Sequence, residues 1–275
     1  MRILPESSQY QGRRSYHWIT GRVLPALATV LVFIFVWQGA ETLFDPPKYL
    51  LPSPSEVFFA FTGSGGYLAR NALVTLNEMI MGLALGSTAG ISLALLVARY
   101  PRTERYVMPV IVTTQTLPVF AIAPLLVIWF GFGAGSKVVM ASLIIFFPVA
   151  SSFHDGLRGT AAEYLDLARG WGASPWQILS KARIPAALPS LASGLRIAAV
   201  LAPIGAVVGE WAGASAGLGY VMLQANARGQ TETVFAAVFI LAITALILRV
   251  AVSKLCDRLV FWQVSPTTSS TRIQD

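Results

Sequence analysis

The stretch LVTLNEMIMGLALGSTAGISLALLVA, residues 73–98, is almost uninterrupted apolar sequence with a single charge, Glu78. A helix needs about 20 mostly apolar residues to cross the hydrocarbon core of a bilayer, and this stretch is long enough. Gly82, Gly86 and Gly90 recur every four residues, a spacing that favours close packing between membrane helices. We therefore predict a transmembrane helix over residues 73–98.

Five further segments meet the same criterion, at residues 23–43, 107–130, 138–154, 189–210 and 233–252. Over the whole chain 55% of residues are hydrophobic and 12% are charged, whereas soluble domains carry roughly 25% charged residues. The expected fold is all-α, a polytopic membrane helical bundle of about six transmembrane helices. The net charge of +7 resides in short loops between apolar segments, which indicates membrane orientation and excludes nucleic acid as the expected partner.

The segment 107–130 contains Pro109, Pro118 and Pro124, and we expect it to kink or break. Neighbouring membrane helices can satisfy the carbonyls that such a break frees. Broken helices line the binding sites of many transporters, although a simple kink explains these prolines equally well. The candidate pathway residues beside the break are Thr114, Gln115 and Thr116.

Lysine and arginine are distributed unequally between the two sets of connecting segments, and cytoplasmic loops of membrane proteins carry the excess. Lys48, Arg70, Lys137 and Arg228 fall on the poorer side, and Arg196 lies within a span. The fifteen residues of the richer side are Arg2, Arg13, Arg14, Arg22, Arg99, Arg102, Arg105, Arg158, Arg169, Lys181, Arg183, Arg249, Lys254, Arg258 and Arg272. We therefore expect a cytoplasmic N-terminal segment (1–22), a transmembrane domain (23–258) with a cytoplasmic loop (155–188), and a cytoplasmic tail (259–275).

The loop 155–188 contains the sequence pattern of a short amphipathic helix. Thr160 and Glu163 have the spacing of a capping box, which predicts a helix start. Apolar side chains then recur at i, i+3, i+4 and i+7, at Tyr164, Leu167, Ala168 and Trp171. Gly170 and Gly172 are expected to end this helix, because glycine accepts a left-handed turn.

A second helix start follows directly. Ser174 and Gln177 form another capping box, with Pro175 at the first helical position. Pro185 and Pro189 are expected to close this helix before the next span. The loop thus becomes a pair of helices with an apolar face. The residues leave three roles open for that face: packing on the protein's own helix ends, lying in the lipid interface, or docking a soluble partner.

The loop resembles the cytoplasmic signature in the membrane subunits of ATP-binding-cassette importers. That signature reads Glu-Ala-Ala, three residues, Gly, nine residues, then Ile-x-Leu-Pro. Asp166-Leu167-Ala168, Gly172 and Ala182-Arg183-Ile184-Pro185 keep its spacing. Ala168, Gly172 and Pro185 are identical to the signature, Asp166 and Ile184 are conservative departures, and Leu167 and Ala182 depart from it.

Flanking segments extend the resemblance from about Pro46 to Arg258. Leu51–Ser55, Gly172–Ser174, Trp176-Gln177 and Pro185–Pro189 resemble the nitrate, sulfonate and taurine branch of these permeases. Residues 115–124, 129–133, 203–211, 226–228 and 231–232 are similar to members assigned to thiamine-precursor pyrimidines. Riboflavin, nitrate, sulfonate and taurine permeases share parts of this pattern. The resemblance therefore favours a hydroxymethylpyrimidine-type solute, with those other solutes as alternatives.

The resemblance implies the rest of a transport machine in the bacterial inner membrane. The implied fold is that of a type I importer permease, expected to pair with a second copy of itself among membrane lipids. An external binding protein would deliver the solute. Cytoplasmic ATPases would bind ATP and Mg²⁺, so this chain would hold no cofactor and catalyse no reaction. The implied contacts to the ATPase are Glu163, Tyr164, Asp166, Leu167, Ala168, Trp171, Gly172 and Pro185.

Two apparent catalytic motifs fail on inspection. Residues 131–138 resemble a phosphate-binding loop but lack the Gly before the lysine and the Ser or Thr after it, which predicts a flexible turn. Residues 213–217 match the pattern of a hydrolase nucleophile elbow, but the two histidines, His17 and His154, fall on the opposite side of the membrane. With one cysteine and no metal-ligand spacing, we expect neither a catalytic residue nor a metal site.

Two acidic residues within the spans are further pathway candidates, because ionisable side chains in membranes usually face a cavity. Glu78 lies deep in its span, and a role in joining helices explains it as well as a pathway role does. Glu210 lies at the outer end of the segment 189–210, beside Trp211, where an interfacial anchor is the favoured interpretation.

Two other classes of protein compete with the importer. An ion-coupled secondary transporter would show paired buried charges and internal repeats, and the sequence offers Glu78 without an evident basic partner. A membrane-embedded enzyme would need a clustered catalytic set.

Overall fold

The computed structural model describes residues 24–116 and 118–262, and these contain helices and no strand, as predicted. The predicted N-terminal segment 1–22, with His17, and the tail beyond Trp262 lie outside the described residues. The helices are α2 (Leu24–Phe44), α3 (Pro54–Arg99), α4 (Pro101–Thr116), α5 (Val119–Phe130), α6 (Ala134–Arg158), α7 (Ala162–Gly170), α8 (Pro175–Ile178), the π-helical turn η2 (Leu179–Arg183), α9 (Ile184–Gly213), α10 (Leu218–Ala227) and α11 (Thr231–Leu259).

Four helical segments in the described part of the chain are long and apolar enough to cross a membrane: Pro54–Arg99, Ala134–Arg158, Pro175–Gly213 and Thr231–Leu259. The other two predicted spans correspond to α2 and to the pair α4 and α5. The pair is separated at Pro118, whose backbone is extended (φ −61°, ψ 113°), so the predicted break is confirmed. Pro109 and Pro124 lie inside helices without ending them.

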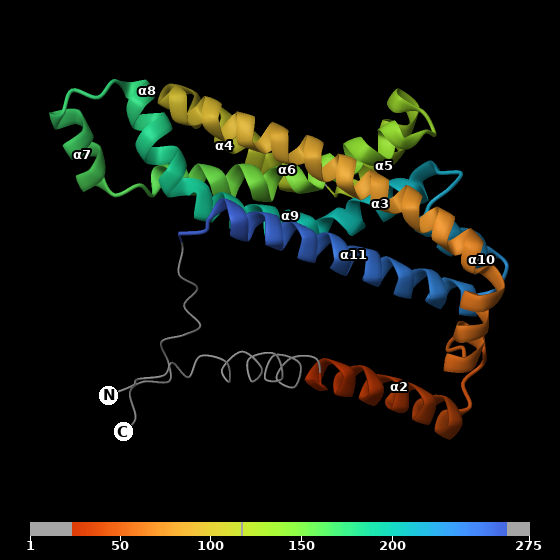
Figure 1. The fold of residues 1–275 in the computed structure, drawn as a ribbon. Coiled ribbons are helices and arrows are strands. Elements are labelled where there is room, and N and C mark those ends of the chain that lie inside the picture. The colour runs from red at the N-terminus through yellow and green to blue at the C-terminus, as the bar shows by residue number, and fades with distance from the viewer. Residues whose placement is uncertain (1–23, 117, 263–275) are drawn as a thin grey trace, which may run out of the picture.

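The bundle is organised around α6, which packs most extensively against α9 and α3 (Figure 1). Glycines allow this approach. A Cβ atom on Gly82 of α3 would lie 2.5 Å from the Cβ of Ala141, and one on Gly205 of α9 would lie 2.5 Å from the Cα of Ala141. Gly86 and Gly90 approach the backbone of α6 equally closely. The predicted glycine packing face is confirmed, and it brings three spans together without side chains between them.

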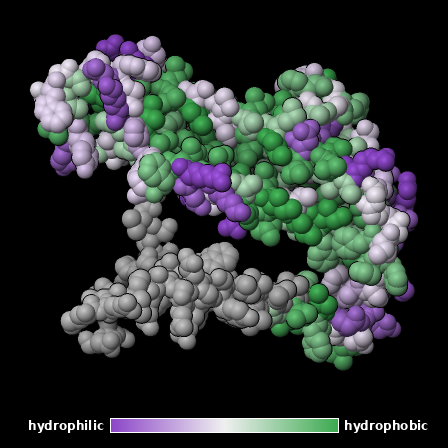
Figure 2. Space-filling model, in the orientation of Figure 1, coloured by the Kyte–Doolittle hydropathy of each residue, from purple (hydrophilic) through white to green (hydrophobic). Residues whose placement is uncertain are grey.

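Apolar side chains cover most of the middle of the bundle, and polar side chains gather mainly towards its two ends (Figure 2). This distribution suits a chain whose midsection lies among lipid tails. α2 stands apart from the other helices (Figure 1). Its main attachment is Trp37, whose ring stacks on Phe235 and Phe239 of α11, with centroids 5.6 and 5.8 Å apart. The indole N–H of Trp37 donates to the carbonyl of Pro52 at 3.2 Å.

Substituting a valine for Gly205 should destabilise the bundle, because no room exists for a side chain between α9 and α6. We expect a loss of about 1–3 kcal/mol, the usual cost of overpacking, measured by thermal unfolding in detergent. Gly39→Val in α2 is the matched control, because its Cβ would meet nothing within 4 Å. Equal unfolding temperatures for the two variants would contradict the proposed packing.

Candidate functional site

The loop helix α7 ends as the glycine pattern predicts. Gly172 has a left-handed backbone (φ +74°). The N–H of Trp171 donates to the carbonyl of Leu167 at 3.1 Å, and the N–H of Ala173 donates to that of Ala168 at 3.0 Å. This pattern satisfies carbonyls that a helix end otherwise leaves unpaired. Gly172 therefore reverses the chain at a defined point between the two loop helices.

The predicted capping box at the start of α7 is wrong. The N-cap is Ala161, and no side chain caps the helix. The hydroxyl of Thr160 instead donates to the carbonyl of Leu157 at 3.3 Å, in the last turn of α6. This donation directs the hydroxyl towards α6, and Thr160 lies one residue before the N-cap position from which a side chain would cap α7.

The second capping box is confirmed, whereas the predicted end of that helix is wrong. The N–H of Ser174 donates to Gln177 Oε1 at 2.8 Å, and the N–H of Gln177 donates to Ser174 Oγ at 3.3 Å. The helix that starts there does not stop at Pro185 or Pro189 but continues through η2 into α9. A proline costs a helix one hydrogen bond and some strain, and packing of α9 in the bundle holds the helix together.

The apolar stripe of α7 faces open space. Tyr164, Leu167 and Trp171 are 67%, 52% and 81% exposed, while Leu165 is the buried residue of this helix. The stripe lines a groove of about 380 Å³ between the two loop helices. The other lining residues are Thr160, Ala168, Lys181, Ala182 and Ala186.

The remaining predicted loop residues also lie at the surface. Glu163, Asp166, Gly172 and Pro185 are exposed. Asp166 accepts a hydrogen bond from Arg169 at 2.7 Å, which holds the polar side of α7 in place. The sequence-predicted residues therefore all lie in the loop segment of α7 and α8 and the start of α9, at one end of the bundle (Figure 1), with the apolar stripe and Asp166 on different sides of α7.

A buried polar cluster lies at the end of the bundle opposite the loop. No local sequence pattern predicts that its members meet. All are 5% exposed or less: Asn71, Thr75, Glu78, Lys137 and Glu210. They come from α3, α6 and α9. Buried polar groups of this kind are stable only when they find partners.

The cluster supplies acceptors for the N-terminus of α10. Asn71 Oδ1 and Thr75 Oγ1 each accept a backbone N–H at 2.8 Å. Glu210 Oε2 accepts two more, one of them at 3.3 Å. The N–H of Gly217 donates to Asn71, and that of Leu218 donates to Thr75. The N–H groups of Gly219 and Tyr220 donate to Glu210. Thr75 also donates its hydroxyl hydrogen to Glu210 Oε1 at 2.6 Å. Side chains of α3 and α9 thus pair the N–H groups that a helix start leaves free.

The glycines of this turn are required by the cluster. Gly217 has φ +113°, and a Cβ there would lie 2.3 Å from the carboxylate of Glu210. A Cβ on Gly219 would lie 2.7 Å from Glu210 Oε2. The small residues that mimic a hydrolase motif at 213–217 therefore form a tight turn around a buried carboxylate.

The interfacial position predicted for Glu210 is wrong, because its side chain is 1% exposed and fully engaged inside the bundle. The turn predicted over residues 131–138 is confirmed only for residues 131–133, because α6 already begins at Ala134. Lys137 lies in the first turn of α6, and its Nζ donates to the carbonyls of Phe132 at 2.6 Å and Gly213 at 2.5 Å. Gly213 is the last residue of α9, where a cation compensates the unpaired carbonyls.

Glu78 completes the cluster. Its side chain is 3% exposed, and its Oε2 atom has no hydrogen-bond partner among the described residues. No ion pair joins Glu78 to Lys137 in the described part of the chain, because Lys137 is engaged by two backbone carbonyls. The members of the cluster that do meet are far apart in the chain: Thr75 and Glu210 are separated by 135 positions. No local sequence signal reports such a contact.

The last pathway candidates lie where α4 ends. Thr114, Gln115 and Thr116 form its final turn, and their side chains lie outside the described part of the structure. Among the described residues no group of three or more His, Cys, Asp or Glu side chains has the arrangement of a metal site.

An apolar helical bundle with an exposed helix pair between two spans is the architecture of a multi-pass membrane protein. The family described as the binding-protein-dependent transport system inner membrane component matches residues 86–260. The chain belongs to this family. It is therefore a permease subunit of an ABC importer in the inner membrane and not itself an enzyme, because the ATPase is a separate subunit.

Related proteins place the chain more finely. A probable ABC transporter permease of Haemophilus influenzae is 47% identical over 88% of this chain and 99% of its own length. The formylaminopyrimidine transport permease ThiX of Halalkalibacterium halodurans is 38% identical, covering 85% of this chain and 93% of its own. A putative aliphatic sulfonates permease, SsuC of Bacillus subtilis, is 33% identical, covering 92% and 91%. The predicted nitrate, sulfonate and taurine branch is confirmed.

The fold also matches solved structures. The MetNI methionine ABC transporter, in an inward-facing conformation, superposes with a TM-score of 0.63 over 72% of this chain and 98% of the matched chain, at 19% identity. This likeness confirms the predicted type I importer permease fold.

The polar cluster can be tested with an isosteric change. Thr75→Val removes the acceptor of the Leu218 N–H, and an unpaired buried donor costs about 1–3 kcal/mol. We expect a corresponding fall in the midpoint of thermal unfolding. Thr88→Val on the same helix is the matched control, because that exposed hydroxyl donates only to the carbonyl of Ala84 in its own helix. An unchanged midpoint for Thr75→Val would refute the role assigned to the cluster.

Proposed function

We propose that this chain forms the solute pathway of an ATP-driven importer and that its loop 155–188 docks the ATPase. The exposed apolar face of α7, next to a groove of about 380 Å³, is the observation that supports docking. Monomeric proteins rarely leave such side chains unpaired without a partner. The proposed contacts are the eight residues predicted from the sequence: Glu163, Tyr164, Asp166, Leu167, Ala168, Trp171, Gly172 and Pro185.

The mechanism uses the continuity of the helix that leaves the loop. α8, η2 and α9 run without interruption from Pro175 to Gly213, over 39 residues. When ATP closes the partner ATPases, a displacement of the loop would tilt α9, because the helix runs without a break from α8 into α9. At its far end α9 holds α3 and α10 through Glu210. Motion of the loop would therefore reach the opposite side of the membrane, as a two-state transport cycle requires.

We propose that the loop, both termini and the tail face the cytoplasm. Arg99, Arg169 and Arg183 line a single pocket of about 310 Å³ between the loop and the α3–α4 turn. Arg158 pairs with Glu104 at 2.5 Å at the same end. Lys48, which was predicted on the side with few basic residues, lies in the segment between α2 and α3, at the opposite end of the bundle. This clustering of arginine supports the orientation expected from the excess of basic residues.

The proposed partners are a second copy of the permease, cytoplasmic ATPases that carry ATP and Mg²⁺, an external solute-binding protein, and lipid. α2 stands away from the bundle and exposes Phe33, Phe35 and Val36. A second permease between α2 and the bundle would cover these side chains and enclose a pathway. The pathway candidates are unchanged: Glu78, Thr114, Gln115, Thr116 and Glu210. The contacts of Glu210 favour a packing role.

The solute we propose is a thiamine-precursor pyrimidine. Support comes from the segments named in the sequence analysis and from the likeness to a formylaminopyrimidine permease. Sulfonate, nitrate, taurine and riboflavin are the alternatives. An ion-coupled transporter would use the buried ionisable groups of Glu78, Glu210 and Lys137 for ion binding. The hydrogen bonds of Glu210 to α10 and of Lys137 to the end of α9 favour a structural use of those two residues instead.

The docking proposal predicts that Tyr164→Asp lowers ATPase binding at least about tenfold, because it places a charge in an apolar contact. Folding should not change, since the side chain is 67% exposed. Co-purification of the ATPase from membranes and ATP-driven uptake are the measurements. Tyr49→Asp is the control, because Tyr49 is 70% exposed at the opposite end of the bundle. Retained ATPase and normal uptake in Tyr164→Asp would exclude docking at this face.

Reconstitution tests transport itself. Vesicles containing the permease, its ATPase and its binding protein should accumulate labelled hydroxymethylpyrimidine only when ATP is supplied, and the permease alone should accumulate nothing. Parallel assays with a sulfonate, taurine and riboflavin identify the solute. Uptake against a gradient by the permease alone, without ATP, would show that the importer mechanism is wrong.

A further inference from the structure

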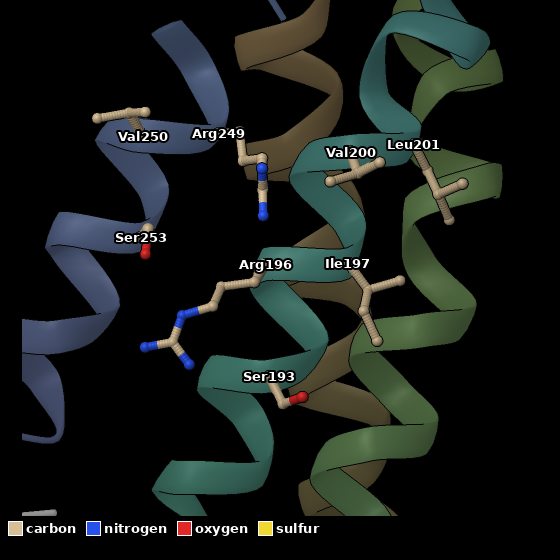
Figure 3. A pocket seen from close by; sticks show the side chains of 8 residues that line it. All are labelled: Ser193, Arg196, Ile197, Val200, Leu201, Arg249, Val250 and Ser253. Atoms are coloured by element: carbon tan, nitrogen blue, oxygen red, sulfur yellow. The ribbon is translucent and has the colours of Figure 1, made fainter. Parts of the chain in front are cut away.

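A groove of about 530 Å³ runs between α9 and α11 and is separate from the loop and from the polar cluster. Figure 3 shows the side chains of Arg196 and Arg249 in the space between the two helices. Eight residues line the groove: Ser193, Arg196, Ile197, Val200, Leu201, Arg249, Val250 and Ser253. Two arginines beside an apolar wall make this groove unlike the rest of the lipid-facing surface.

The groove carries its two arginines at different levels. Ser193 and Arg196 lie nearest the loop end of α9, and Val200 and Leu201 lie about 6–12 Å further along the helix at 1.5 Å per residue. Figure 3 shows Arg249 of α11 beside Val200, with Ser253 one turn nearer the loop end. The occupant that matches this lining is amphipathic, with an anionic group between the two arginines and an apolar part against the aliphatic side chains.

The charge in the groove is positive. Arg196 Nη2 donates to Asp257 Oδ1 at 2.7 Å, which offsets one charge. Among the described residues Arg249 has no ion-pair partner. Both arginines lie within the predicted spans, and Arg249 lies further from the loop end than Arg196 (Figure 3). An arginine at this depth is costly unless an anion or water meets it.

We propose that this groove binds the headgroup phosphate of an anionic phospholipid, with an acyl chain along Ile197, Val200 and Val250. Basic pockets between spans on the cytoplasmic side favour such lipids, so the proposal rests on the orientation given above. A solute crossing from outside is a poorer match. Towards the other end, the exposed residues of α9 and α11 are apolar: Ile204, Trp211, Val238, Ile243 and Leu246.

The test uses the full-length chain in nanodiscs of phosphatidylcholine containing increasing phosphatidylglycerol, with bound lipid counted by native mass spectrometry. The wild type should retain phosphatidylglycerol in preference to phosphatidylcholine. Arg249→Gln should weaken that retention about tenfold, because one charge-assisted contact is lost. Lys254→Gln is the control, since Lys254 is an exposed cation on the same helix that does not line the groove.

Three results would overturn the proposal. If the wild type and Arg249→Gln retain phosphatidylglycerol equally, the groove does not bind the lipid. If Lys254→Gln loses as much phosphatidylglycerol as Arg249→Gln does, the lipid is held by general charge attraction and not by the groove. Displacement of the lipid by glycerol phosphate or inorganic phosphate, at concentrations matching the lipid, would show that the site takes a soluble anion. Failure of ATPase docking at Tyr164 would leave all three readouts unaffected, so the two proposals can fail separately.

Discussion

A backbone N–H that is buried away from water must find an acceptor, and this requirement governs the end of the bundle opposite the loop. α9 ends and α10 begins within the protein, so a carbonyl and several N–H groups lose their helical partners. Glu210, Thr75 and Asn71 pair the N–H groups, and Lys137 pairs the carbonyl of Gly213. The interruption between α9 and α10 is thus stabilised by side chains of two other helices, α3 and α6, together with Glu210 of α9 itself.

This arrangement gives α9 a defined role at each of its ends. Its loop end continues without a break from the loop helix α8 through η2, and its other end is held by buried hydrogen bonds. Between them, Gly205 brings α9 against α6 without an intervening side chain. A long, continuous helix that is tightly packed and held at one end can carry a displacement from one side of the bundle to the other. The architecture is therefore suited to passing a mechanical signal from a soluble partner across a membrane.

The features that the sequence predicted correctly depend on composition or on neighbouring residues. Hydropathy gave the apolar spans, Pro118 gave the break, and Ser174 with Gln177 gave a helix start. Two local predictions failed because another element intervened: Leu157 takes the hydroxyl of Thr160, and packing carries α9 past Pro185. The polar cluster was not predictable, since a single sequence does not reveal that Glu210 and Lys137 meet side chains and carbonyls on other helices.

The π-helical turn η2 sets an angular phase between the loop and the span that follows it. A π turn holds one more residue than an α turn, and each helical residue corresponds to a rotation of about 100°. The direction in which α8 points, relative to the buried side of α9, therefore depends on a single inserted residue at Leu179–Arg183. In this protein the register of one turn thus sets how the loop is rotated about the axis of the span that follows it.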